Sequence, residues 1–279
     1  MPARPRARDP GDMAIRSIPP SSPSSSISPS QHPPVLRRLT LTELRLLLRE
    51  RVVLVFAIAL PVLLLVIFGA IPAFRRPVVK GLPGVSILDA YIPILIAFVL
   101  AMMAISVLPA TLAGYREKGV LRRLALTPVG PRRVLAAQLI ICAGMTVVTL
   151  ALILALARIA YDVPLPRQAA GFALATALAV LALFSIGLLY AAIASTGKAA
   201  NAMGTITFFP LMFFAGLWLP VDDMPSVLRH ISHATPLGAA VQALQDSWQG
   251  HWPHPVQLLT LAAYAVAFAV AAARLFRWE

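Results

Sequence analysis

Long apolar runs separated by short polar segments dominate the chain from residue 52 onward. Each run approaches or exceeds about 20 residues, the length that an α-helix needs to cross a bilayer. The pattern predicts six membrane-spanning helices, over Val52–Ile71, Ala90–Ala113, Val134–Ala157, Ala169–Ala194, Ala199–Leu219 and Val256–Phe276. Six such runs cannot all be hidden in a soluble domain of 279 residues. The sequence therefore predicts an all-α, polytopic membrane protein, with residues 52–276 as its transmembrane domain.

Two different segments precede the first span. Residues 1–34 contain nine prolines and eight serines and no apolar signal-peptide core, which predicts a disordered cytoplasmic tail, with Met13 as an alternative start. Residues 35–51 place leucines on one helical face and arginines on another. This pattern predicts an amphipathic helix on the membrane surface, or alternatively a cytoplasmic extension of the first span.

Charge is scarce and unevenly distributed. The chain is 59% hydrophobic and 13% charged, whereas soluble domains carry about 25% charged residues. Its net charge of +13 comes from basic residues at the membrane edges, which argues against nucleic-acid binding. With both termini in the cytoplasm, the inner segments from residue 35 onward hold 14 Lys or Arg and the outer loops six. This asymmetry predicts a cell-membrane protein of that orientation.

Acidic residues are missing from all six predicted spans. Proton-coupled pumps usually carry buried acids, and channels usually carry charged rings or filter motifs. Residues 195–200 resemble part of a phosphate-binding loop, but the motif needs a glycine at position 192 and Ser or Thr at 199, where this chain has alanines. The chain is therefore not expected to be an enzyme, and energy for transport must come from another protein.

The most charged segment inside the hydrophobic region, Tyr115–Leu135, joins the second and third spans on the predicted cytoplasmic side. Val120, Leu121 and Leu124 are spaced as on one face of a short helix, which the Thr127-Pro128 pair ends. A short helix tied to two spans can transmit force from a soluble partner. A basic inner loop with no special role is the alternative.

The order of residues here, Glu117-x-Gly119-x-Leu121-x-x-Leu124-x-x-Thr127-Pro128-Val129, resembles the signature of the type-2 ABC exporter permease family, in particular the daunorubicin-type drug-resistance branch. The outer segment fits the same family, whose short re-entrant helices match Leu219-Pro220, Met224-Pro225 and Pro236-Leu237. The chain departs from the family at Val120, where Thr is common, and at Arg122, where Glu is common.

The resemblance implies that residues 117–128 form a coupling helix that docks on a separate ATP-binding subunit. Its interface residues would be Glu117, Gly119, Leu121, Arg122, Arg123, Leu124, Thr127 and Pro128. It also implies two ATP-binding subunits that hold ATP and Mg, and a second permease, identical or related. The expected cargo is an amphipathic or hydrophobic small molecule such as a drug, antibiotic or lipid-like product. Export of a lipid-linked glycan and a non-transport assembly role are the alternatives.

Three further groups are candidates for function. An aromatic set on the fifth span, with a nearby amide, predicts a cargo path, although it could equally face lipid or pack between helices: Phe208, Phe209, Phe213, Phe214 and Asn201. The acid pair Asp222-Asp223 could attract a cation at the outer mouth, but capping of a short helix is the preferred interpretation. Four outer histidines are spaced irregularly, so no metal site is predicted.

Overall fold

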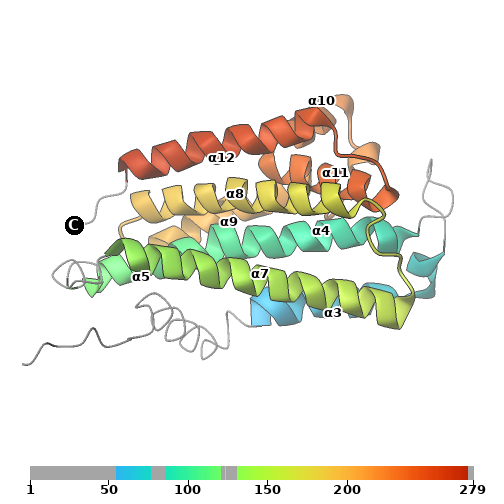
Figure 1. Cartoon of the computed structure of the whole chain (residues 1–279), viewed down its shortest axis with the longest axis horizontal. Helices are drawn as coiled ribbons and strands as arrows, with labels where there is room; N and C mark the ends of the chain where they lie inside the picture. The colour runs from blue at the N-terminus through green and yellow to red at the C-terminus, as the bar shows by residue number, and fades with distance from the viewer. Residues whose placement is uncertain (1–54, 77–85, 121–122, 124–130, 276–279) are drawn as a thin grey trace, which may run out of the picture. The chain divides into compact units, whose positions relative to one another are not determined.

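The computed structural model describes residues 55–76, 86–120, 123 and 131–275, and every regular element in these ranges is a helix (Figure 1). The predicted tail and the predicted interfacial helix lie outside the described residues. The long helices are α7 (Pro131–Tyr161), α8 (Ala169–Ile193), α9 (Gly197–Phe214) and α12 (Pro255–Leu275). The second span is continuous over Ile87–Glu117, with α4 (Ile87–Ala101), the π-helix η3 (Met102–Val107) and α5 (Leu108–Glu117) in sequence.

Four of the predicted spans are confirmed as helices long and apolar enough to cross a membrane: Ile87–Glu117, Arg133–Tyr161, Ala169–Ile193 and Pro255–Leu275. The described part of the first predicted span is the π-helix η1 (Val55–Ala59) followed by α3 (Leu60–Ala70), and its crossing of the membrane stays a prediction. α9 is a helix at the predicted place but is not among these four. Its crossing of the membrane therefore stays a prediction.

The fifth predicted helix ends five residues earlier than expected. α9 stops at Phe214, and Gly216 takes a left-handed backbone conformation with φ +87°. The Gly216 N–H donates to the Phe213 carbonyl at 3.0 Å, and the Leu217 N–H donates to the Met212 carbonyl at 3.2 Å. These two bonds form a Schellman motif, a glycine-based C-cap in which N–H groups beyond the helix bond to its last carbonyls. Leu217–Leu219 therefore belong to the outer segment and not to the helix.

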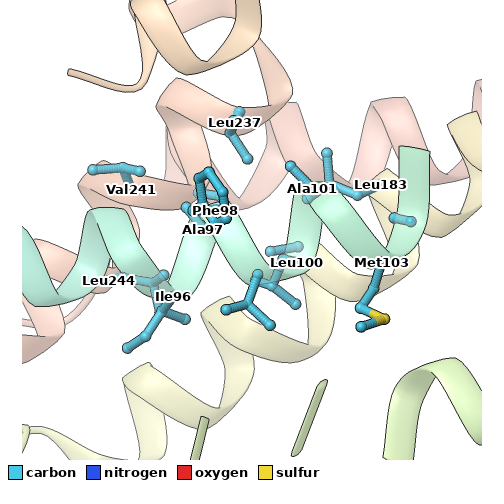
Figure 2. Packing of buried hydrophobic residues seen from close by; sticks show 14 of the residues in the cluster. Ile96, Ala97, Phe98, Leu100, Ala101, Met103, Leu183, Leu237, Val241 and Leu244 are labelled. Carbon is cyan, nitrogen blue, oxygen red and sulfur yellow. The ribbon is translucent and has the colours of Figure 1, made fainter. Parts of the chain in front are cut away.

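The span Ile87–Glu117 forms the centre of the helix packing. α4 contacts α3, α7, α8 and α11 (Pro236–Gln249), while α12 packs mainly along α8. Figure 1 shows α4 between α7 on one side and α8 on the other. Figure 2 shows side chains of α4 and η3 meeting Leu183 of α8 and three residues of α11, namely Leu237, Val241 and Leu244. All three of these α11 residues are buried.

Each π-helix stands directly before a proline at the second position of the following α-helix. Pro61 follows η1 and Pro109 follows η3. Proline lacks an N–H and its ring clashes with the carbonyl four residues earlier, which for Pro109 is that of Ile105. The wider turn accommodates this, and the Leu108 N–H reaches back five residues to the Met103 carbonyl. Pro61 and Pro109 thus explain the two π-helices, which the hydrophobic pattern of the sequence did not predict.

Close approach of neighbouring helices depends on glycines at this same place. A Cβ on Gly187 of α8 would overlap the carbonyl oxygen of Ala104, and one on Gly204 of α9 would overlap that of Ile105. Small residues let helix backbones touch in a membrane, where lipid gives helices no hydrophobic drive to associate. η3 is therefore held from two sides by helix backbone.

Outer elements complete the chain between α9 and α12. They are the 3-10 helix η4 (Val221–Asp223), α10 (Ser226–Ala234) and α11, and a further 3-10 helix, η2 (Pro72–Arg75), follows α3. α11 contacts α4, α8, α9 and α12, and its apolar residues are buried. α11 is therefore a short helix buried among the longer ones, and its re-entrant placement in a membrane stays a prediction.

Candidate functional site

The described part of the predicted coupling segment is the end of α5 and the turn after it. α5 ends at Glu117, and Gly119 has φ +67°, a conformation that glycine adopts without strain. The Gly119 N–H donates to the Arg116 carbonyl at 2.9 Å, and the Arg123 guanidinium donates to the Lys118 carbonyl at 2.9 Å. The Glu-x-Gly part of the motif therefore has a local structural role, which is to end α5. Leu121, Arg122, Leu124, Thr127 and Pro128 lie outside the described residues.

Glu117 contacts its own chain. One carboxylate oxygen accepts a hydrogen bond of 3.0 Å from the N–H of Gly197, the first residue of α9. Thr196, the residue before α9, also caps this helix by accepting from the Ala199 N–H at 3.1 Å. Helix N-termini have unpaired N–H groups and a partial positive charge, so a carboxylate is favourable there. The sequence placed Glu117 at a partner interface and missed this internal bond.

Arg116 holds the other side of the same turn. Its guanidinium donates to the Ala192 carbonyl at 3.1 Å and also to the Ala194 carbonyl, at the C-terminal end of α8. A cation is favourable at a helix C-terminus, where carbonyl groups lack partners. Sequence reasoning counted Arg116 only as one of several inner basic residues. The sequence did contain one signal for these contacts. Arg116 and Glu117 are adjacent and of opposite charge at the end of the second span, and the short turn between the fourth and fifth predicted spans lies on the same predicted side of the membrane.

These contacts define the inner clamp, which consists of Arg116, Glu117 and the turn Ala192–Gly197. It lies at the opposite end of α8 from Gln168, whose N–H donates to the Ser247 carbonyl of α11 at 3.0 Å. α8 has 25 residues, so its two ends are about 37 Å apart. The predicted cytoplasmic and outer segments are therefore at opposite ends of the helix packing.

The outer end has side-chain bonds of its own. The Gln257 amide of α12 donates to the Asp246 carboxylate of α11 at 2.8 Å, while its carbonyl accepts from the His254 N–H at 3.0 Å. The Tyr91 hydroxyl of α4 donates to the Leu217 carbonyl at 3.2 Å. These bonds tie α11 to α12 and the end of α9 to α4.

The aromatic residues predicted to line a cargo path divide into different environments. Phe208 is buried and packs edge-on against Phe98 of α4, with ring centroids 5.4 Å apart. Phe209 is 55% exposed and stacks on Trp218 with centroids 6.3 Å apart. Phe213 and Phe214 are half-buried and contact each other. Phe208 is thus a packing residue in this structure, whereas Phe209 faces outward.

Asn201 lies on the same outward face of α9 as Phe209, together with Thr205 and Ile206. The Thr205 hydroxyl donates to the Asn201 carbonyl of its own helix at 2.9 Å. The side chains at 201, 205 and 209 are spaced by four residues, so they follow one line along the helix. We refer to Asn201, Thr205, Ile206 and Phe209 as the exposed stripe of α9.

The outer acids and histidines do not form a shared site in the described residues. Asp223 is exposed at the end of η4, and the N-cap positions of η4 and α10 are Pro220 and Pro225, so the preferred capping interpretation is not observed for Asp223. The side chain of Asp222 lies outside the described part. Over the ranges that the structure describes, no three His, Cys, Asp or Glu side chains are grouped closely enough to hold a metal ion.

The helices define the class of protein. Four long apolar helices, the predominantly exposed apolar surface of α12 and the small-residue contacts between helix backbones are the features of a polytopic α-helical membrane protein.

Comparison with known proteins identifies the family. A model of the ABC-2 type transporter family matches residues 35–247, and the chain belongs to this family. Relatives include a probable multidrug ABC transporter permease, YbhR, of Escherichia coli K12, which is 25% identical over 187 residues, covering 63% of this chain and 51% of the relative. The inner membrane transport permease YhhJ of the same strain is 27% identical over 187 residues, covering 64% and 49%. The chain thus spans about half the length of the curated relatives it matches.

Proposed function

We propose that this chain is the membrane-spanning permease subunit of an ATP-driven exporter, and that it works as a dimer with two separate ATP-binding subunits. ATP and Mg bind to those subunits, and this chain contributes the path and the coupling but no catalysis. The segment 117–128 docks on the ATP-binding subunit. Closure of the two nucleotide-binding subunits then switches the spans from an inward-facing to an outward or lateral opening.

One observation carries this proposal. The basic segment with the family signature connects the end of α5 directly to the start of α7, so it is anchored at both ends in the helix packing. Membership of the ABC-2 family supports the same role, since both relatives are named as permeases. The excess of basic residues on this side supports a location in the cell membrane with both termini in the cytoplasm.

The proposed cargo is an amphipathic or hydrophobic small molecule, and its proposed path follows the exposed stripe of α9. This stripe offers an aromatic ring and an aliphatic side chain, with two polar side chains nearer the inner end. An exposed amide facing lipid is unfavourable, which favours a second permease or a cargo over that face. The word "multidrug" in the name of YbhR supports the same class of cargo.

Co-purification tests the ATP-driven assembly. The chain is expressed with a candidate ATP-binding subunit and solubilised mildly, and the wild type is compared with Leu124→Asp. A charge in the predicted docking helix should reduce recovery of the partner at least about tenfold, because it introduces an unpaired charge into an apolar contact. Lys198→Asp changes an exposed residue in the first turn of α9, at the same end of the molecule, and serves as the control. Equal recovery with Leu124→Asp and wild type would contradict docking through this segment.

Drug sensitivity tests the cargo class. Cells that express the complex are challenged with a panel of amphipathic antibiotics, and Phe209→Ala is compared with Leu259→Ala on the exposed face of α12. Loss of one aromatic contact of about 0.5–1.5 kcal/mol should lower protection against at least one compound several-fold in Phe209→Ala only. Equal protection by both variants, with equal expression, would argue against the stripe as the path.

A further inference from the structure

The inner clamp joins α5 to α8 and α9 through hydrogen bonds from two side chains of α5 to backbone atoms of the other two helices. Arg116 reaches the last carbonyls of α8, and Glu117 reaches the first N–H of α9. Because the acceptors and the donor on the turn are all main-chain groups, the clamp fixes the position of the turn itself and not of a side chain on it. Arg116 is half-buried and Glu117 is exposed, so the clamp is at the edge of the helix packing.

The charges match the helix ends that they contact. Arg116 meets the negative end of α8, and Glu117 meets the positive end of α9. Two adjacent residues of α5 therefore hold both ends of a turn that would otherwise expose unpaired backbone groups. Gly197 also packs closely on α5, since a Cβ there would lie 3.1 Å from the Ala110 carbonyl oxygen and 3.4 Å from the Gly114 Cα. The bonds of the clamp are therefore made where the backbones of α5 and α9 are already in close contact.

The clamp is also placed directly before the predicted coupling segment. Glu117 is the last residue of α5, and Gly119 turns the chain away immediately after it. On the other side, α9 starts at Gly197 and carries its exposed stripe from Asn201, only one helical turn further on.

We propose that Arg116 and Glu117 are positioning residues that make the end of α5 and the α8–α9 turn move as one body, so that displacement of the coupling segment is passed to α9. That the ATP-binding subunit displaces the coupling segment rests on the proposed function. The bonds of Arg116 and Glu117 to the α8–α9 turn are a property of this chain alone. Packing of α9 on α5 and η3 already couples these helices, and the clamp adds a polar link at the start of α9.

The link is tested first in the permease alone. Hydrogen exchange is measured on the full chain in lipid nanodiscs. The double variant Arg116→Ala/Glu117→Ala is compared with Lys198→Ala, which removes an exposed charge at the start of α9. Exchange of the Gly197 amide should rise about tenfold in the double variant, because local opening of the turn becomes easier. It should rise less in Glu117→Gln, which keeps an acceptor oxygen. Equal exchange in the double variant and in Lys198→Ala would overturn the clamp.

The transmission step is tested in the complex with the ATP-binding subunit. A fluorophore is placed on Thr205→Cys of the exposed stripe, in a Cys142→Ala background because Cys142 is the only native cysteine. The probe added is a non-hydrolysable ATP analogue. Its effect on the fluorescence should fall at least about threefold in the double clamp variant, with the complex still intact. A merely structural cap on α9 would leave this response unchanged, and a full response in the double variant overturns the proposal.

The outcomes separate the two proposals. Failure of the wild-type chain to bind the ATP-binding subunit, or to respond to the analogue, overturns the proposed function and with it the transmission step. The exchange experiment then still decides whether the clamp ties α5 to the α8–α9 turn.

Discussion

The span Ile87–Glu117 and the helix α12 look alike along the sequence but have opposite surroundings. Both are long apolar helices, yet 89% of the most apolar part of Ile87–Glu117 is buried inside the chain, against 17% for Pro255–Leu275. Apolar length therefore predicts that a helix can cross a membrane, but not whether its neighbours are protein or lipid. The difference depends on features that hydrophobicity does not measure, above all on where neighbouring helices carry glycine.

The largest expected effect comes from filling the glycine contacts of the central span. Gly204→Val places a branched side chain against the Ile105 carbonyl, and should destabilise the folded protein by about 3 kcal/mol or prevent its folding. Thermal unfolding in detergent, followed by size-exclusion chromatography, measures the loss. The matched control is Gly144→Val on α7, where a Cβ meets nothing within 4 Å. Similar losses in the two variants would show that α9 does not approach the central span so closely.

A smaller effect is expected from removing one aliphatic side chain from each region. Leu100→Ala removes a fully buried side chain of α4 and should cost about 2–4 kcal/mol, because a cavity remains. Leu259→Ala on α12 removes a side chain that is 68% exposed and should cost under about 0.5 kcal/mol. The same unfolding measurement compares them. If Leu259→Ala were as costly as Leu100→Ala, the exposed face of α12 would be covered by another protein surface and not by lipid.

Of the three comparisons, the smallest difference between variant and control is expected at the start of α12, where Gln257 ties it to α11. Gln257→Leu removes the amide that bonds Asp246 and the His254 N–H, and should cost about 1 kcal/mol through the loss of these bonds. Thr260→Val is the control, because the Thr260 hydroxyl bonds only within α12, to the Val256 carbonyl. Hydrogen exchange over residues 250–258 should rise in Gln257→Leu. Unchanged exchange there would mean that packing alone holds this end.

Much of the fold could be predicted from the sequence because membrane spans are encoded by composition over a long window. Four spans occur where the apolar runs predicted them, to within a few residues of their ends. The early end of α9 was missed because a single left-handed glycine, Gly216, ends a run that remains apolar through Leu219. The π-helices were missed because no residue type specifies them, and the prolines that favour them are also common in ordinary membrane helices.

The candidate sites were less predictable because their contacts join distant parts of the chain. The sequence predicts Glu117 at a partner interface, which stays a prediction, and its observed contact is with Gly197, which is 80 residues away. Arg116 was missed for the same reason, since its acceptors lie 76 and 78 residues away. The aromatic set of the fifth span also did not separate buried Phe208 from exposed Phe209, because residue type alone does not show which side of α9 packs on α4.

The π turn at Met102–Val107 has a consequence for how this span tolerates changes in length. A π turn contains one residue more than the α-helical turn it replaces, since its N–H groups reach back five residues and not four. Deletion of one residue inside this turn would restore ordinary helix spacing and keep both flanking helices in register. Deletion of one residue in the middle of α8 would instead rotate everything after it by about 100°. Within the span Ile87–Glu117, η3 is therefore the place where the helix already accommodates one extra residue.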